Sequence, residues 1–245
     1  MKVLDIYNLI DKIAPFNTAM SFDNVGILCG NSENSVEKIL ICLDITDAVI
    51  EEAKGLSANL IISHHPVIFD PIKKIDSNSI LAKLIKNDIN AIACHTNIDK
   101  CEKLGTNRAL ADKLGFKEIQ ASENGEYFVL NLKTNVKNLA NHIKNCFPNC
   151  NLQFSNFDSD IKKIALCSGA GSTVIYDNES IDALITGEIK HDAWLEAMHK
   201  NIAIFAFGHY DTEILYCEQL QKYLQKNTEE EIYISKKELN PIRVI

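Results

Sequence analysis

The chain has 245 residues, 46% of them hydrophobic, and a formal net charge of −8 at pH 7. This length is enough for one large domain or for two small domains that each bury a hydrophobic core. The negative charge argues against non-specific nucleic-acid binding, which needs a basic surface, and no run approaches the roughly 20 apolar residues of a membrane span.

The N-terminus and the cysteines favour a cytoplasmic protein. Met1–Asp5 brings an acidic residue early and no long apolar stretch follows it, so we do not expect a signal peptide. Eight cysteines are scattered along the chain without a C-x-x-C pair, and several of them lie inside apolar runs. A cysteine in such a run acts as a small hydrophobic residue, and reduced thiols are typical of the cytoplasm.

Strand-like and helical patterns alternate through the first half of the chain. The expected elements are a helix at 3–14, a short strand before residue 30, a strand at 38–43, a helix at 46–54, a strand at 60–63, a helix at 79–86, a strand at 91–94 and a helix at 106–114. We expect Thr46 or Asp47, and later Thr106, to be helix N-caps, and Gly55 to end the second helix. Such a βαβ series predicts a parallel sheet with helices on its faces.

A polar stretch at 117–126 predicts a domain boundary. A strand at 127–132 and a helix at 135–146 follow it. We therefore expect one α/β domain formed by residues 1–122 together with 214–245, and a second formed by residues 123–213.

The second half of the chain echoes the first. Residues 38–44 resemble 163–169, residues 58–65 resemble 182–188, and residues 89–95 resemble 202–209. The shared order predicts an α/β protein made of two related domains, an internal repeat, with a dinuclear metal site in the cleft between them. Convergent βαβ patterning is the alternative explanation of these similarities.

Three apolar runs end in histidines. Leu60–Ser63 is followed by His64 and His65, and two later runs are each followed by a histidine with a carboxylate four residues on, which are the pairs His95/Asp99 and His209/Glu213. Residues i and i+4 share one face of a helix. Ligands of open α/β sheets bind just beyond the carboxyl ends of the strands, so we expect these side chains to converge there.

Five of these residues form a candidate metal-binding set: His64, His65, Asp99, His209 and Glu213. The set exceeds what one tetrahedral ion needs, and it suits two divalent ions about 3.5–4 Å apart. Mixed nitrogen and oxygen ligands fit Zn, Fe, Mn, Co or Ni without choosing among them. His95 and Asp44 are candidates for orienting the ligands and moving protons.

Together these motifs resemble the GTP cyclohydrolase 1 type 2 homologue family, also called the Nif-three-like family. The resemblance rests on Asp23-Asn24-Val25-Gly26, Ser63-His64-His65-Pro66, His95-Thr96-Asn97-Ile98-Asp99, Thr186-Gly187-Glu188 and Gly208-His209-Tyr210-Asp211-Thr212-Glu213. It implies the short form without an inserted domain and a ring-shaped homohexamer. It also implies a dinuclear site whose five ligands match the set above, with Glu213 as the bridging carboxylate. The chain departs from the family pattern at His191-Asp192, where a second histidine is common.

The resemblance implies a metal-dependent hydrolase that acts on a nucleotide-like or other anionic small molecule, with GTP cyclohydrolase activity as the named reaction. Two divalent ions per chain would activate water, and His95 would transfer protons. The chain has no P-loop or Rossmann fingerprint for a triphosphate. Two alternatives stay open: a metal chaperone, store or cofactor-assembly factor that is not an enzyme, and a ring-shaped interaction scaffold.

Overall fold

The computed structural model describes residues 1–177 and 179–243 and divides the chain into two compact units. Unit 1 comprises Met1–Leu104 and Tyr216–Pro241, and unit 2 comprises Gly105–Leu215 with the described end of the chain from Ile242. The first division falls after Leu104, earlier than the expected boundary at 122/123. The second, after Leu215, lies beside the expected boundary at 213/214.

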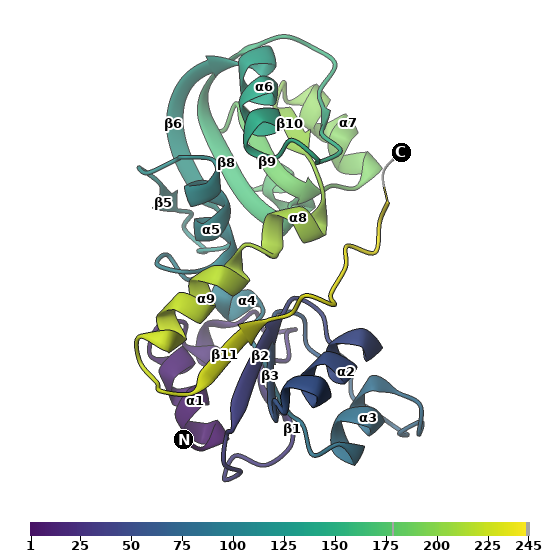
Figure 1. Ribbon diagram of the computed structural model, residues 1–245. Coiled ribbons are helices and arrows are strands. Elements are labelled where there is room, and N and C mark those ends of the chain that lie inside the picture. Colours follow the sequence, from purple (N-terminus) through teal and green to yellow (C-terminus); the bar gives the residue numbers. More distant parts are fainter. Residues whose placement is uncertain (178, 244–245) are drawn as a thin grey trace. The chain divides into compact units, whose positions relative to one another are not determined.

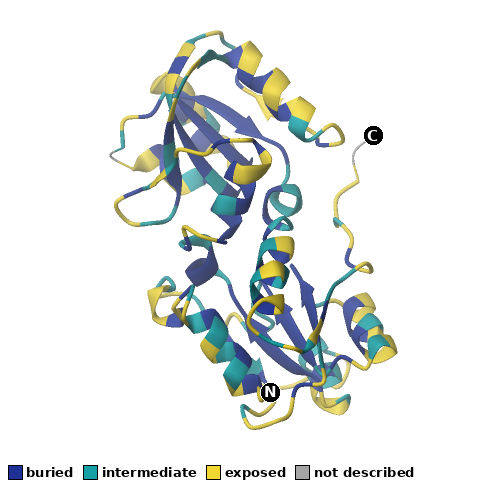
Figure 2. Cartoon of the chain, turned by 60° about the vertical axis from the view of Figure 1, so that its left-hand side comes forward, coloured by how far each residue is buried: buried dark blue, intermediate teal, exposed yellow. Residues whose placement is uncertain are grey.

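Unit 1 is built on a five-stranded sheet in the order β1-β4-β3-β2-β11. Its strands are β1 (Gly26–Cys29), β2 (Lys38–Cys42), β3 (Leu60–Ser63), β4 (Asn90–Ala93) and β11 (Glu231–Ile234). All neighbours pair in parallel except β1, which runs antiparallel to β4. Residues in β2, β3 and β4 are almost continuously buried, because helices cover both faces of the sheet (Figure 2).

The helices of unit 1 lie on the two faces of this sheet (Figure 1). They are α1 (Val3–Asp11), η1 (Phe16–Thr18), α2 (Asp47–Leu56), α3 (Ile80–Lys86), α4 (Thr96–Asp99) and α9 (Tyr216–Gln225). Alternate strand residues such as Leu40 and Ile61 pack with Val49 and Ala53 of α2 and Leu84 of α3 in one buried cluster. The other face carries α1 and α9.

Unit 2 is built on a six-stranded sheet in the order β5-β6-β8-β9-β10-β7. Its strands are β5 (Gln120–Ala121), β6 (Phe128–Asn135), β7 (Gln153–Phe154), β8 (Asp160–Ala170), β9 (Ala183–Glu188) and β10 (Ala203–Ala206). The three strands β8, β9 and β10 are parallel, and β6 and β7 pair antiparallel with the outer members of that group.

Helices cover both faces of the second sheet as well. They are α5 (Thr106–Lys113), α6 (Val136–Cys146), η2 (Ser172–Tyr176), α7 (His191–His199) and α8 (His209–Glu213). One core joins α5 and α6 to strand residues such as Leu166 and Phe205, and the other joins α7 and η2 to Ala165 and Leu184. Alternate residues of the same strands thus supply the two cores, as the pleat requires.

The structure confirms a mixed α/β protein with two sheets. Three parallel strands lie side by side in chain order in each unit, β2-β3-β4 in the first and β8-β9-β10 in the second. These are the segments that resemble each other in sequence. The origin of the two halves in an internal repeat stays a prediction.

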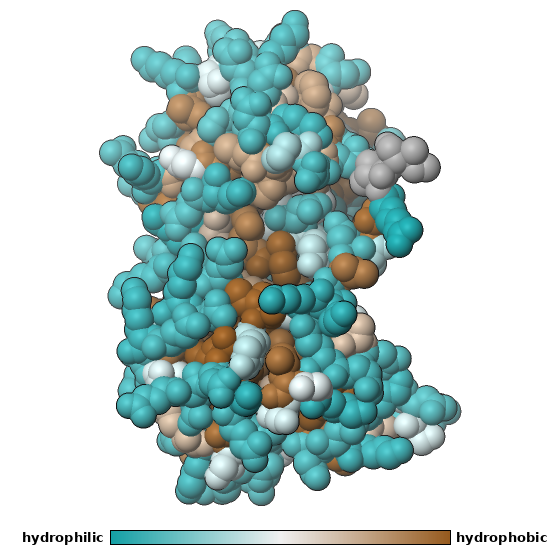
Figure 3. Space-filling view, in the orientation of Figure 1, coloured by the Kyte–Doolittle hydropathy of each residue, from teal (hydrophilic) through white to brown (hydrophobic). Residues whose placement is uncertain are grey.

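Hydrophilic residues dominate the face seen in Figure 3 on both units. Six cysteines are buried, and Cys146 and Cys167, both in unit 2, are half-buried. None of the helices within the described residues has the length and apolar character that crossing a lipid bilayer demands.

Candidate metal-binding clusters

In unit 1 the carboxyl ends of β3 and β4 bring three histidines together. The two strands are parallel neighbours, with Ser63 opposite Ala93, so the residues that follow them leave the sheet at the same edge. One nitrogen from each of His64, His65 and His95 lies within 4.8 Å of the others. We refer to these three residues as the histidine cluster.

Each ring of the histidine cluster is held through the same nitrogen. Nδ1 of His64 lies 2.8 Å from the carbonyl oxygen of Cys94. Nδ1 of His65 lies 2.9 Å from Oδ1 of Asp44, and Nδ1 of His95 lies 2.9 Å from Oδ1 of Asp23. Because all three partners are acceptors, they favour a proton on Nδ1 and a lone pair on Nε2. This tautomer is the one that a metal ligand needs.

Asp99 adds a carboxylate beside this cluster. It ends the one-turn helix α4, which begins directly after His95, and its Oδ1 lies 3.6 Å from Nε2 of His64. The structure therefore places three of the five proposed ligands, His64, His65 and Asp99, in unit 1. His95, which we expected to orient ligands and move protons, is a full member of the cluster.

Hydrogen bonds also hold Asp23 and Asp44, the residues that accept from His95 and His65. Asp23 accepts hydrogen bonds from His95 and from the backbone amide and hydroxyl of Thr96. Burial alone would raise the pKa of Asp23, but these hydrogen bonds outweigh it and hold the pKa well below its usual range. The amides of Leu43 and Asp44 both donate to the carboxylate of Glu238, a buried residue near the end of the chain. Sequence reasoning missed Glu238, because no motif marks it.

In unit 2 the short helix α8 carries the other two proposed ligands. His209 and Glu213 lie one helical turn apart, and Nε2 of His209 is 2.9 Å from Oε2 of Glu213. Nδ1 of His209 is 3.2 Å from Oε1 of Glu188, the last residue of β9. The hydrogen bond that His209 donates to Glu213, together with the weaker influence of Glu188, raises the pKa of His209 to about 9 although burial opposes it.

Two glycines and a threonine shape the surroundings of α8. An added Cβ on Gly169 would overlap the carboxylate of Glu213, and one on Gly187 would lie 2.8 Å from Cα of His209. The hydroxyl of Thr212, which is fully buried, accepts from the amide of Gly169 and lies 2.9 Å from the carbonyl oxygen of His209. Sequence reasoning missed the roles of Gly169 and Thr212, because packing against a neighbouring strand leaves no local pattern.

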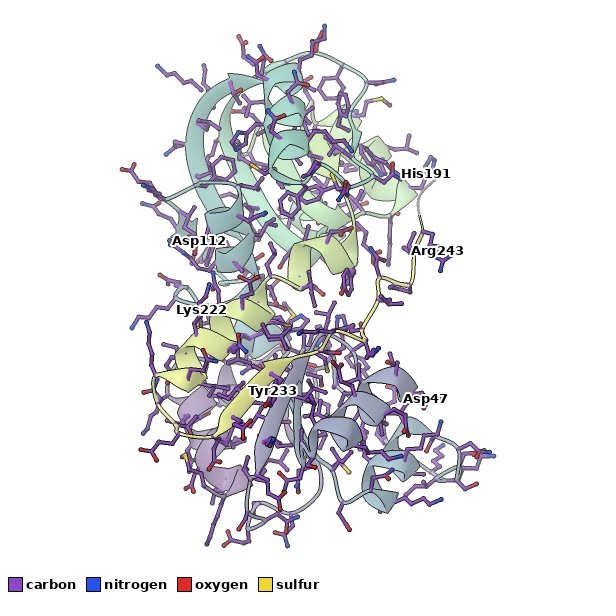
Figure 4. The ribbon with its side chains drawn as sticks, viewed as in Figure 1. Asp47, Asp112, His191, Lys222, Tyr233 and Arg243 are labelled. Carbon is purple, nitrogen blue, oxygen red and sulfur yellow. The ribbon has the colours of Figure 1, made fainter. Side chains whose placement is uncertain are left out.

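His191, at which the family pattern is broken, starts α7 and is exposed (Figure 4). Within the described residues it joins neither group of candidate ligands. His142 packs at the surface of unit 2, with Nε2 2.8 Å from the carbonyl oxygen of Leu114.

The donor set fits divalent transition ions. Imidazole nitrogens and carboxylate oxygens are the ligands that Zn, Fe, Mn, Co and Ni accept, and acceptors on the distal nitrogens are typical of metal-binding histidines. Buried thiols lie nearby in sequence, but burial raises the pKa of Cys94, which opposes formation of the thiolate that a metal would bind. The chemistry at both clusters is therefore that of nitrogen and oxygen ligands.

Comparisons with known proteins found relatives that match the whole chain or nearly all of it. A family model described as Duf34/NIF3 (NGG1p interacting factor 3) matches residues 1–241. Proteins named "GTP cyclohydrolase 1 type 2 homolog" are similar: one from Clostridium perfringens is 34% identical with both chains fully covered, and one from Campylobacter jejuni is 32% identical over 92% of each chain.

Solved structures with a similar fold also match the whole chain or nearly all of it. A hypothetical protein from Staphylococcus aureus matches with a TM-score of 0.89 at 28% identity, covering 100% of this chain and 99% of that one. Reduced HcgD from Methanocaldococcus jannaschii matches with a TM-score of 0.82 at 27% identity, covering 96% and 98%.

Proposed function

Because the chain belongs to the Duf34/NIF3 family, we propose that it binds two divalent metal ions through His64, His65, Asp99, His209 and Glu213, and that it hydrolyses a nucleotide-like substrate. The observation that carries the metal-binding part is the shared anchoring of the histidines. Nδ1 faces an oxygen acceptor in all four of His64, His65, His95 and His209. Histidines that merely pack need no such uniformity, whereas metal ligands do.

The charge of a two-ion site and the names of the relatives support a hydrolytic reaction. Two divalent ions would supply Lewis-acid activation of water and would neutralise charge on an anionic substrate. The relatives from Clostridium perfringens and Campylobacter jejuni carry names that refer to GTP cyclohydrolase. Opening of a guanine ring by water is therefore the first reaction to test.

His95 is the proposed proton-transfer residue. Asp23 holds its Nδ1, so the ring is oriented and Nε2 can accept a proton while the carboxylate stabilises the imidazolium that forms. The side chain of His95 is 19% exposed and that of His64 is fully buried. A partly exposed ring can pass a proton on to solvent, which a fully buried one cannot do directly.

The test loads the purified chain with Zn, Mn or Fe in turn, adds GTP, and follows the fluorescence of a pterin product. His65→Ala removes one proposed ligand, and His199→Ala, a surface change on α7, is the matched control. We expect turnover in the wild type and in His199→Ala, and its loss in His65→Ala together with bound metal. His95→Gln should abolish turnover while both ions stay bound.

Other results would redirect the assignment. Two tightly bound ions without turnover on any nucleotide would favour the metal chaperone, store or cofactor-assembly role. No saturable binding of any of these ions would contradict the metal-binding proposal itself. Loss of an ion in His95→Gln would make His95 a ligand instead of the proton-transfer residue.

We further propose a cytoplasmic, ring-shaped homohexamer. The family resemblance supports the ring, and the absence of a disulfide among the cysteines of residues 1–177 and 179–243 supports a reducing compartment. Light scattering on the purified chain would give six copies per particle if the ring forms, and one or two copies if it does not.

A further inference from the structure

Two aromatic rings stand open to solvent in unit 1. The exposed fractions are 62% for Phe22 and 47% for Phe69. Their ring centroids are 6.3 Å apart and their planes are tilted by 47°. Phenylalanine rings bury well, so two exposed rings next to one another are a candidate binding surface.

The pair is continuous with the histidine cluster. The ring of Phe69 meets that of His95 edge-on, with centroids 6.4 Å apart. The ring of His95 lies 5.4 Å from that of His65 and 5.1 Å from that of His64. The pair of phenylalanines therefore adjoins the ring of His95, which belongs to the cluster whose nitrogens could hold a metal ion.

Hydrogen bonds anchor the residues next to both rings. Phe22 precedes Asp23, whose carboxylate is bound by His95 and Thr96. Asn24 then donates from Nδ2 to the carbonyl oxygen of Ile68, the residue before Phe69, at 2.7 Å. Both phenylalanines thus stand next to anchored residues, so their exposure is built into the fold. A backbone that is already anchored at these positions loses little freedom when a ligand binds.

We propose that Phe22 and Phe69 form a platform that binds the planar heteroaromatic ring of the substrate, of the purine class, beside the histidine cluster. This inference rests on the proposed function and specifies its substrate. Aromatic rings stack or meet edge-on at centroid distances of about 4.5–7 Å, so a base on this platform would come within reach of the cluster. Every purine base has a π-face that can stack on an aromatic ring, so the platform suits any purine, whatever is attached to its sugar.

A competing explanation is that a second copy of the chain covers the two rings. The chain of ring contacts from Phe22 through Phe69 to His95 favours the substrate, because an interface between copies has no need to lead into a cluster of candidate ligands. The test includes this explanation as an outcome.

The experiment measures binding to the metal-loaded full chain by calorimetry. The probes are guanosine, which has the ring without phosphate, and tripolyphosphate, which has the charge without the ring. The variants are Phe22→Ala, Phe69→Leu, and Phe22→Ala with Phe69→Ala. Phe154→Ala is the control, because Phe154 is also 47% exposed but lies in unit 2.

We expect the double variant to bind guanosine roughly 10–100-fold more weakly, with tripolyphosphate affinity and metal content unchanged. Phe69→Leu should lose most of the same affinity, because it keeps apolar bulk but loses the π-face. Phe154→Ala should bind like the wild type.

The proposal is overturned if the wild type shows no saturable guanosine binding, or if the double variant binds guanosine as the wild type does. A change in particle size in the double variant with unchanged guanosine affinity would identify an interface between copies. Guanosine should still bind to His65→Ala, so failure of the hydrolase assignment and failure of the platform give different results.

Discussion

Gly169 leaves room for the carboxylate of Glu213. Gly169 has a φ of +61°, a conformation that residues with a side chain rarely adopt, and any Cβ there would overlap Glu213. A residue on β8 thus decides where a candidate ligand on α8 can lie. Both the positive φ of Gly169 and the lack of space for a Cβ therefore favour glycine at this position.

Gly169→Ala should therefore weaken metal binding through His209 and Glu213 by at least tenfold. The physical reason is displacement of the Glu213 carboxylate. The measurement is a competition titration with a chelating dye. Gly115→Ala is the matched control, since Gly115 also has a positive φ, +77°, but open space around it. Equal losses in the two variants would mean that backbone strain, and not the overlap with Glu213, is responsible.

Asp44→Asn should reduce metal affinity roughly 10–100-fold, because the acceptor that orients the ring of His65 is weakened. Asp47→Asn serves as the control, since Asp47 forms an ion pair with Lys83 on the surface of α2 and α3. The same titration measures both. Unchanged affinity in Asp44→Asn would show that the aspartate does not orient a ligand.

Thr212→Val should lower the free energy of unfolding by about 1–3 kcal/mol, because the buried amide of Gly169 loses its acceptor while the side-chain volume is nearly kept. Thr212→Ser keeps the hydroxyl and should cost less. Urea unfolding of the metal-free protein measures both. A larger loss in Thr212→Ser than in Thr212→Val would contradict the hydrogen-bonding role.

Metal binding through His209 should strengthen with pH. The pKa of His209 is raised to about 9, chiefly by the hydrogen bond with Glu213, so the metal-free ring is protonated at neutral pH. An ion must displace this proton, and apparent affinity should rise about tenfold per pH unit up to about pH 9. Titrations between pH 6.5 and 8.5 test the slope, and His199→Ala should not change it. A flat profile would show that His209 does not bind the ion.

Without metal the same proton stabilises the fold, with the opposite dependence. A raised pKa in the folded state means that the contribution is complete below about pH 6.5, the ordinary value, and is lost as pH rises through about 9. Thermal unfolding of the metal-free chain should therefore move to lower temperature across that range, and His209→Gln should remove this dependence.

The alternation of the elements was predictable because each strand is a short apolar run and each helix is amphipathic. The clustering of His64, His65 and His95 was equally accessible, because parallel neighbours such as β3 and β4 must end at one edge. What could not be predicted is which acceptor holds each ring. Asp23 reaches His95 from a turn far away in sequence, and only the tertiary fold brings the two together.

Two local expectations were wrong for similar reasons. Thr106 is the first residue of α5 and not its N-cap, because its hydroxyl accepts from Ser168 on β8. Gly55 does not end α2. The helix ends at Leu56, and its C-cap is Ser57, which has a φ of 58° and takes the left-handed conformation that the glycine was expected to supply. In both cases the expected role fell to a neighbouring residue.

The burial of the cysteines makes the chain ready for selective chemical labelling. Thiol-reactive dyes need an accessible thiolate, and burial raises the pKa of Cys29, Cys42, Cys94, Cys150 and Cys217. Cys146 and Cys167 are the half-buried pair, and both belong to unit 2. A maleimide fluorophore should therefore attach to that unit first, which would give a reporter on α6 and β8 without any engineered cysteine.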